Sequence, residues 1–233
     1  MFCFVSLFLF CCRFQSIFVT DRFLQMQEHR QDNQGPETAI IILAAGGSSR
    51  MGSPKQLLGI GGTSLISRLA GVAITASLGP VLVVLGANSD QIREELRHLD
   101  IHFVFNEEWS EGIASSIRSG FLYLQQNLPE INAAIVMLAD QPLVDVPLLR
   151  RLATASQDSG HSIITCDYGS VTGPPTLFKR NHFKALLELH GDEGAKKVVI
   201  KNPASLGVVP FAGGKTDLDT PGDYFKFLSR EDT

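Results

Sequence analysis

Short hydrophobic runs alternate with amphipathic stretches along the chain from residue 38 onward. The runs contain few polar residues, which is typical of strands buried on both faces of a parallel sheet. The stretches between them place apolar residues three and four positions apart, which predicts helices with one buried face. Strands are predicted at 39–44, 80–86, 101–106, 133–139 and 161–168, and helices at 64–77, 88–99, 113–126 and 146–155.

Such alternation of strands and helices is the pattern of an α/β fold. The order of the elements predicts a Rossmann-like, doubly wound and mostly parallel sheet with right-handed crossovers, in a single domain covering residues 38–230. In such sheets ligands bind beyond the carboxyl ends of the strands. Residues that directly follow the hydrophobic runs are therefore the first candidates for a functional site.

The first 37 residues do not share this pattern. An apolar run from Met1 to Cys12 is shorter than the roughly 20 residues that a membrane-spanning helix needs. No Lys or Arg precedes Cys12, whereas a signal peptide carries positive charge before its apolar run. We interpret residues 1–37 as an apolar leader or the result of a start codon placed too early, with Met26 as the alternative start, followed by a polar linker.

Composition narrows the class of protein. The chain has 233 residues, of which 44% are hydrophobic and 19% charged, and its formal net charge is -4. These values exclude a disordered chain, and the scattered basic residues predict neither a nucleic-acid groove nor a firm membrane association. After residue 37 the only cysteine is Cys166, in the apolar run SIITC, where we expect a small buried side chain. Without a disulfide framework, the expected location is the cytoplasm.

A glycine-rich loop, LAAGGSSRMGSPKQLL at 43–58, follows the first predicted strand. Glycine lets the main chain approach a ligand closely, and consecutive backbone N–H groups in such a loop bind anions. Arg50 and Lys55 add positive charge, so the loop suits a triphosphate. It is neither a dinucleotide fingerprint nor a Walker A loop, because Gly52 is followed by Ser-Pro-Lys. A flexible connection with incidental Gly and Ser is the alternative.

Polar and small residues also follow the third predicted strand, in NEEWSEGIASSIRSG at 106–120. Asn106 can donate to and accept from a base edge, and Gly112 allows close approach of a ligand. Ser115 and Ser116 fall in the first turn of the next predicted helix, where helix capping is the competing interpretation. Trp109, the only tryptophan, either packs against the protein or stacks on a base.

Acidic residues follow the fourth predicted strand and recur near the C-terminus. Asp140 lies where the sheet ends, and a carboxylate there can hold Mg²⁺ beside substrate phosphates. Asp145 directly precedes a predicted helix and is interpreted as its N-cap. Asp219 lies in the string TDLDTPGDY, which would also suit a turn that starts a helix at Pro221, and Asp217 is the alternate ligand.

Four of these segments together resemble the MobA-like NTP transferase family of nucleotidyltransferases, in its molybdenum cofactor cytidylyltransferase branch. The string at 43–58 resembles the family's Leu-Ala-Ala-Gly-x-Ser-x-Arg-Met-Gly-x-x-Lys-x-Leu, and 106–120 its Asn-x-x-Trp-x-x-Gly-x-x-x-Ser stretch. The strings MLADQPLVD at 137–145 and TDLDTPGDY at 216–224 resemble its two acidic motifs. The resemblance covers nearly all of 38–228 and implies the fold of the nucleotide-diphospho-sugar transferases.

Members of this family join a nucleoside monophosphate to a phosphorylated acceptor and release pyrophosphate. Carried over, the resemblance implies that Arg50, Lys55 and Asp140 are catalytic and that Asp140 and Asp219 hold Mg²⁺. It implies in-line attack on the α-phosphorus without a protein nucleophile. The residues implied to bind the nucleotide are Leu43, Ala44, Ala45, Gly46, Gly47, Ser48, Arg50, Met51, Gly52, Lys55, Asn106, Gly112, Ser115, Ser116 and Asp140.

The resemblance also bears on both substrates. Family members with Ala-Ala-Gly in the first motif, as at 44–46, tend toward cytidine, so transfer of CMP from CTP to molybdopterin or molybdenum cofactor is expected, with a molybdoenzyme as a candidate recipient of the product. The acceptor is expected at GPPTLF (173–178) and GDEGA (191–195), where Pro174 replaces the family's His. Lys179 and Arg180 are candidate contacts to an anionic acceptor.

Two other functions remain open at this stage. Because Pro174 departs from the family pattern, the chain could be a guanylyl- or other nucleotidyltransferase acting on a sugar phosphate. It could also be a non-catalytic partner that binds a nucleotide or the cofactor. The presence of both acidic motifs favours a working enzyme.

Overall fold

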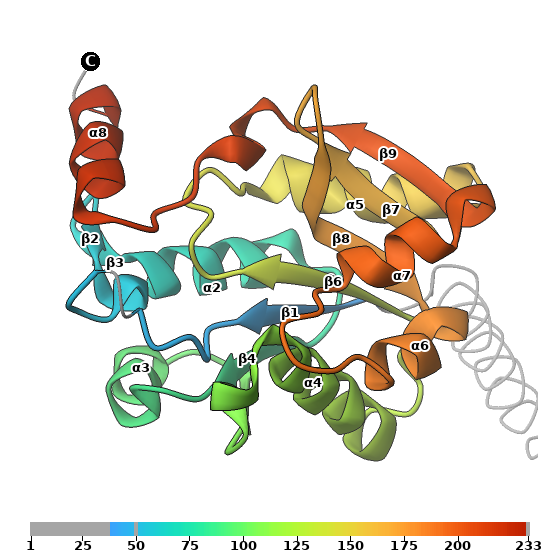
Figure 1. Cartoon of the computed structure of the whole chain (residues 1–233), viewed down its shortest axis with the longest axis horizontal. Helices are drawn as coiled ribbons and strands as arrows, with labels where there is room; N and C mark the ends of the chain where they lie inside the picture. Colours follow the sequence, from blue (N-terminus) through green and yellow to red (C-terminus); the bar gives the residue numbers. More distant parts are fainter. Residues whose placement is uncertain (1–37, 49–50, 232–233) are drawn as a thin grey trace, which may run out of the picture. The chain divides into compact units, whose positions relative to one another are not determined.

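The hydrophobic runs of the sequence form strands of one central sheet. Helices pack on both faces of this sheet and bury them. The computed structural model describes residues 38–48 and 51–231, so the predicted leader at 1–37 and Arg50 lie outside the described residues. The sheet has seven strands in the order β5-β4-β1-β6-β8-β7-β9 (Figure 1). Their bounds are β1 (Thr38–Leu43), β4 (Val81–Leu85), β5 (His102–Phe105), β6 (Ala133–Leu138), β7 (Ile163–Asp167), β8 (Thr172–Lys179) and β9 (Leu206–Pro210).

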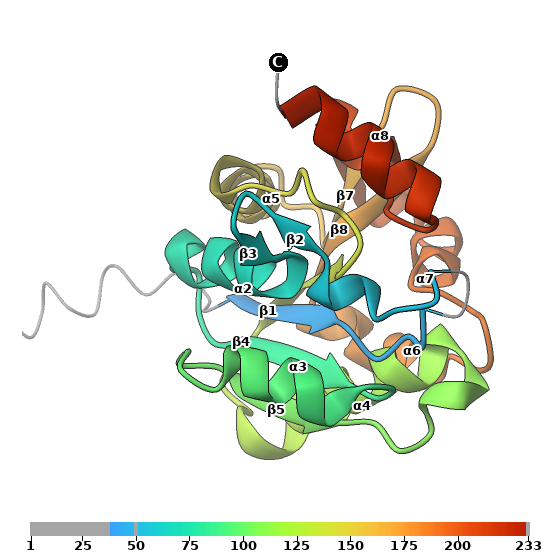
Figure 2. The ribbon, with the colours of Figure 1, turned by 90° about the vertical axis from the view of Figure 1, so that its left-hand side faces the viewer.

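The strand order confirms the doubly wound, mostly parallel sheet. β5, β4, β1 and β6 are parallel neighbours. From β1 the chain winds outward to β4 and β5, and then continues on the other side of β1 with β6. The winding therefore reverses between β1 and β6, and the carboxyl ends of strands at such a reversal are the usual place for a ligand. Figure 2 looks onto this end of the sheet.

Two strands of the sheet, β8 and β9, were absent from the sequence prediction. β8 lies between β6 and β7 and runs antiparallel to both, whereas β9 is parallel to β7. The sequence of β8 begins Thr-Gly-Pro-Pro. This start hides the strand from prediction, because proline donates no ladder hydrogen bond. This antiparallel insertion brings Gly173 and Pro174 toward the carboxyl end of β6 and sends Lys179 to its amino end, opposite Ala133.

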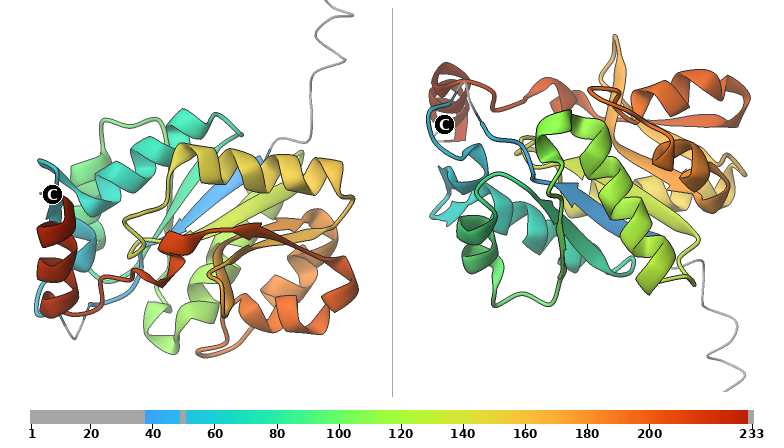
Figure 3. Two further views of the ribbon diagram at one scale, coloured as in Figure 1. Left: turned by 90° about the horizontal axis from the view of Figure 1, so that it is seen from above. Right: turned by 60° about the horizontal axis from the view of Figure 1, so that its bottom comes forward.

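Helices cover the two faces of the sheet with separate sets of apolar side chains. Ile40 and Ile42 of β1 pack on the side of α2, α3, α5 and α8, and Ile41 packs on the side of α4, α6 and α7. Figure 3 shows α2 and α5 on one face and α4 on the other. The bounds are α2 (Leu65–Ala76), α3 (Ser89–Leu96), α4 (Ile113–Asn127), α5 (Val146–Asp158), α6 (Phe183–Leu187), α7 (Lys196–Lys201) and α8 (Pro221–Glu231).

Local hydrogen bonds set the starts of several helices. Asp145 is the N-cap of α5, as predicted, and its side chain accepts from Leu148 N–H at 2.8 Å. Ser64 caps α2 in the same way. A short hairpin, β2 (Gly59–Ile60) and β3 (Thr63–Ser64), precedes α2, and Tyr224 of α8 donates its hydroxyl to Gly59 O. None of the helices described here is long and apolar enough to cross a membrane.

Candidate active site

Three charged side chains from distant parts of the sequence meet at the carboxyl end of β6. Lys55 Nζ, from the loop after β1, lies 2.5 Å from Asp140 Oδ2 and 3.2 Å from Asp219 Oδ1. Leu218 N–H donates to Asp140 O at 3.0 Å, which fastens the C-terminal acidic segment to the end of β6. The structure thus brings together the lysine and both carboxylates that the sequence motifs singled out.

The electrostatics of this cluster favour a charged lysine. Burial opposes the ammonium form of Lys55, but the adjacent carboxylates of Asp140 and Asp219 outweigh it and raise the pKa of Lys55 above its usual value. Asp217 faces the same cluster. Loss of solvent and the negative charges of Asp140 and Asp219 raise the pKa of the Asp217 carboxyl to about 6. The cluster therefore carries excess negative charge that a cation can neutralise.

The donor set fits a divalent cation that also binds substrate phosphates. Asp140 Oδ1 is buried and has no hydrogen-bond partner among the described residues, so this hard oxygen can contribute to a cation site beside the Lys55 contact. Among the described residues no group of three His, Cys, Asp or Glu side chains forms a complete cation site. Mg²⁺ is commonly held by one or two carboxylates, with substrate phosphates and water completing its shell. Asp140 and Asp219 match that requirement.

A buried glutamine that the sequence prediction missed bonds the backbone at the start of the glycine-rich loop. Gln56 is 1% exposed, and its Nε2 donates to Ala44 O at 3.0 Å and Gly46 O at 2.9 Å. Ser48 Oγ accepts from Lys55 N–H at 3.0 Å. A Cβ on Gly46 would meet no atom of the described residues within 4 Å, so this part of the chain leaves space beside the loop. No periodic pattern marks Gln56, because it acts on the backbone of one loop.

Trp109 forms one wall beside this loop. A Cβ on Gly86, at the end of β4, would lie 2.5 Å from Trp109 Cβ, and one on Gly47 would lie 3.3 Å from its ring. The small residues therefore make room for the indole, which is still 39% exposed. The sequence left open whether Trp109 packs against the protein or stacks on a base. The indole does pack against the protein, and its exposed part borders the loop.

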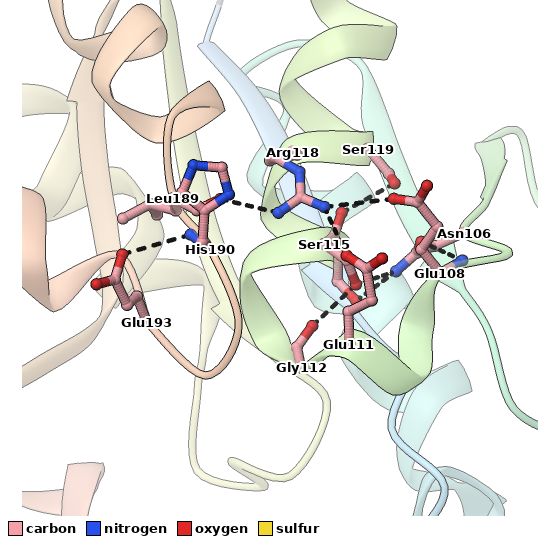
Figure 4. Close-up of polar contacts among 11 residues, drawn as sticks. Asn106, Glu108, Glu111, Gly112, Ser115, Arg118, Ser119, Leu189, His190 and Glu193 are labelled. Atoms are coloured by element: carbon pink, nitrogen blue, oxygen red, sulfur yellow. Dashed lines mark hydrogen bonds and ion pairs between the residues drawn. The ribbon is translucent and has the colours of Figure 1, made fainter.

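From the sequence, we expected the Asn106 amide to face a base edge. In the structure, the amide instead forms hydrogen bonds within the protein. Asn106 is 4% exposed, and its Nδ2 donates to Ser115 Oγ at 2.8 Å and Ser116 Oγ at 3.0 Å (Figure 4). Its Oδ1 accepts from Glu108 N–H at 3.0 Å. Ser115 in turn donates to Gly112 O at 2.8 Å, and the N-cap of α4 is Gly112 rather than either serine. These side chains shape the loop before α4.

Gly112 is required by a close approach to the segment between α6 and α7. Its φ is +112°, and a Cβ there would lie 2.5 Å from both Gly191 O and Asp192 Oδ1. Ala114 N–H donates to Gly191 O at 3.0 Å, which joins the start of α4 to the same segment. The stretch at 106–120, which the family resemblance links to the nucleotide, therefore directly contacts the stretch at 191–195, which it links to the acceptor.

A cavity of about 130 Å³ lies next to this contact, on the α4 side of the sheet. It is bordered by the ends of β1 and β6, the first turns of α4, the start of β8 and the segment leading into α7. Its lining is mainly apolar and consists of Leu43, Ile113, Ile117, Val136, Leu138, Thr165, Thr172, Gly173, Pro174, Thr176, Gly194, Ala195, Lys196 and Val199.

Gln141 and Tyr168 fix the start of β8 beside Asp140. Gln141 is 2% exposed and donates from Nε2 to Tyr168 Oη at 3.0 Å, and the Tyr168 hydroxyl donates to Pro174 O. Burial raises the pKa of Tyr168, so its hydroxyl stays protonated. Tyr168 was also missed by the sequence analysis, because its link to Pro174 depends on the antiparallel turn between β7 and β8.

Two basic residues expected near the acceptor lie elsewhere. Lys179 Nζ donates to Ser156 O at 3.0 Å, and Arg180 donates to the carbonyls of Pro129 and Ile131 at 2.6 and 2.7 Å. Both lie at the amino end of β6, opposite the end that carries Asp140, because β8 is antiparallel. The expectation that they meet the acceptor is therefore wrong.

Comparison with known proteins agrees with the family resemblance that the sequence motifs indicated. The sequence model of the MobA-like NTP transferase domain matches residues 40–205. Nicotine blue oxidoreductase of Paenarthrobacter nicotinovorans is 26% identical over 84% of this chain and 99% of that protein. The crystal structure of Rv0371c from Mycobacterium tuberculosis H37Rv superposes with a TM-score of 0.73 at 30% identity, over 83% of this chain and 98% of that one. Rv0371c is also known in complex with manganese, with a TM-score of 0.70 at 28% identity over 83% of this chain and 98% of that one.

Proposed function

The chain belongs to the MobA-like NTP transferase family, and we propose that it transfers CMP from CTP to molybdopterin or molybdenum cofactor with release of pyrophosphate. The observation that carries the proposal is the meeting of Lys55, Asp140 and Asp219 at the point where the sheet reverses its winding. Beside that point lies a glycine-rich loop, and the described residues leave space beside its Gly46. Together they offer positive charge, hard oxygen ligands and anion-binding amides to a triphosphate and a cation.

Each of the charged residues has a role in this proposal. Lys55 is protonated at neutral pH and is within reach of the same space as the carboxylates, so it can neutralise the charge of the departing pyrophosphate. Asp140 and Asp219 would hold Mg²⁺, which supplies charge neutralisation at the phosphates when bound. Arg50, from the same loop, is proposed to assist Lys55 by the family resemblance. No side chain of the cluster is placed as a nucleophile, so catalysis rests on orientation and charge.

The choice of CTP rests on the Ala-Ala-Gly string at 44–46. Ala44 and Ala45 are 1% and 3% exposed, and Gln56 holds the carbonyl groups of Ala44 and Gly46 in place. The backbone of the first motif is thus held in one conformation, and its polar groups can distinguish one base from another. Buried Cys166, a free thiol, supports the cytoplasmic location that the proposal includes.

The cavity beside α4 is the proposed place for one ring of the acceptor. Its volume of about 130 Å³ is close to that of cavities that accept a single aromatic ring, roughly 150 Å³, so it fits part of a larger acceptor. Polar groups of an acceptor must keep hydrogen bonds when they are buried. The hydroxyls of Thr165 and Thr176 already bond to each other at 2.9 Å, and Thr165 also donates to Gly173 O. A molybdoenzyme that receives the product completes the proposed partners.

Pyrophosphate release by the full-length chain tests the proposal. We expect release with Mg²⁺ and CTP only when molybdopterin is present, and slower release with GTP, ATP and UTP. Asp140→Ala should abolish release, since it removes a ligand of the cation. Asp145→Ala is the matched control, because Asp145 caps α5 and should cost only about 1 kcal/mol of stability. Release with none of the four nucleotides would overturn the proposal.

A further inference from the structure

Arg118, on α4, bridges the two sides of the candidate site (Figure 4). One arm of its guanidinium, Nη1, donates to Leu189 O at 2.8 Å. The other arm, Nη2, donates to Glu108 Oε2 at 3.3 Å and Glu111 Oε2 at 3.1 Å. The Arg118 side chain is 22% exposed, and its contact with Leu189 O is partly shielded from water, whereas Glu108 and Glu111 are 66% and 53% exposed. One planar fork therefore binds the loop before α4 and the segment after α6 at the same time.

The two segments joined by Arg118 carry different parts of the site. The loop before α4 contains Asn106 and Gly112, next to the Trp109 wall of the glycine-rich loop. The segment that begins at Leu189 leads through Gly191 to 194–199, which supplies one wall of the 130 Å³ cavity. Ile113 and Ile117 of α4 itself also line the cavity. Arg118 thus connects the helix with the segment that lines the same cavity.

Other contacts at this junction involve the backbone. Ala114 N–H donates to Gly191 O, and Gly112 lies against the peptide of Gly191. These contacts hold the start of α4. Arg118 lies more than one turn further along the helix and reaches the junction with its long side chain. Arginine suits this place because its planar fork offers donors in two directions, whereas the single Nζ of a lysine reaches one partner well.

We infer that Arg118 is a positioning residue that holds segment 189–195 against α4 and so sets the width of the acceptor cavity. The identification of the cavity's occupant as the acceptor rests on the proposed function, but the contact itself does not. Removal of the guanidinium loosens the wall formed by 194–199 and leaves Lys55, Asp140 and Asp219 in place. Acceptor binding is therefore affected much more than nucleotide binding or the chemical step.

Two measurements on the full-length chain test this inference. Hydrogen–deuterium exchange of segment 189–195 is compared among wild type, Arg118→Ala, Arg118→Lys and the control Arg150→Ala. Arg150 is a matched control because it also bonds two carbonyls, Ala76 O at 3.2 Å and Thr75 O at 2.9 Å, at the far end of α2. KM for molybdopterin, KM for CTP and kcat are then measured for the same four proteins.

We expect exchange in 189–195 to accelerate in Arg118→Ala, to be intermediate in Arg118→Lys and to be unchanged in Arg150→Ala. KM for molybdopterin should rise about tenfold in Arg118→Ala, as expected for loss of a charge-assisted hydrogen bond, with KM for CTP and kcat changing less than about twofold. Unchanged exchange in Arg118→Ala would overturn the inference, as would a rise in molybdopterin KM matched by Arg150→Ala. If wild type shows no transfer, the proposed function fails, and the exchange result still decides the role of Arg118.

Discussion

Replacement of Lys55 by methionine tests the electrostatic design of the site. Methionine keeps most of the length and apolar volume of the lysine stem but removes the Nζ that lies between Asp140 and Asp219. The two carboxylates, with Asp217 nearby, then repel each other without a cation between them. We expect lower stability without metal, and recovery when Mg²⁺ takes the place of the ammonium.

The magnitude follows from the exposure of the partners. Asp140 and Lys55 are 15% and 18% exposed, so their 2.5 Å contact counts as a charge-assisted hydrogen bond of roughly 1.5–3 kcal/mol. Asp219 is 37% exposed, so its 3.2 Å contact is screened and contributes roughly 0.5 kcal/mol. Burial of a methionine in place of an ammonium offsets part of the loss. A net cost of about 2 kcal/mol corresponds to a fall in Tm of roughly 4–8 °C for a chain of this size.

Thermal unfolding at neutral pH, with and without Mg²⁺ and without nucleotide, provides the assay. Mg²⁺ at about 100 times its Kd would add roughly 2.7 kcal/mol, enough to restore the melting temperature of Lys55→Met. Wild type should gain less, because Lys55 competes for the same carboxylates. Lys179→Met is the control, since Lys179 bonds Ser156 O and lies at the amino end of β6, away from Asp140. Equal melting of Lys55→Met and wild type, or an equal gain from Mg²⁺ in both, would refute the reasoning.

Three further predictions concern single residues. Gly112→Ala should cost roughly 3 kcal/mol in chemical denaturation, because the backbone is strained at φ +112° and a Cβ meets Gly191 O, whereas Gly62→Ala in open space should cost about 1. Asp217→Asn should raise stability at pH 8 but not below pH 4: the folded pKa of about 6 exceeds the ordinary value of 3.8, so the contribution of Asp217 is complete below pH 4, falls progressively between pH 4 and 6, and is lost at pH 8. Native Cys166 should resist alkylation at pH 8, as mapped by mass spectrometry, because burial raises its pKa to about 12; rapid labelling would contradict this.

Much of the fold could be predicted because its parallel strands are continuous apolar runs. β1, β4 and β6 are buried along almost their whole length, and that leaves a clear pattern in the sequence. β8 escaped prediction because Pro174 and Pro175 resemble a loop, and its place between β6 and β7 depends on long-range pairing. Sequence periodicity reports burial of a segment but not the order of strands around an antiparallel insertion.

The candidate site was predictable where a residue directly follows a strand. Asp140 is found this way, because the end of β6 fixes its position. Asn106 follows the same rule, but the sequence shows only what its amide can bond and not that Ser115 and Ser116 already bond it. Gln56 and Arg118 were missed because each donates to a backbone carbonyl ten or more residues away in the sequence, a role without a local sequence pattern.

The most direct test of the account follows the α-phosphate of CTP. Full-length chain is incubated with Mg²⁺, molybdopterin and CTP labelled in its α-phosphate, and both the labelled product and pyrophosphate are measured. The account predicts a labelled cytidine–molybdopterin conjugate formed one for one with pyrophosphate, and its loss in Asp140→Ala. Label that remains in CTP, or that appears only as free CMP, would contradict the claim that this site transfers a nucleotide.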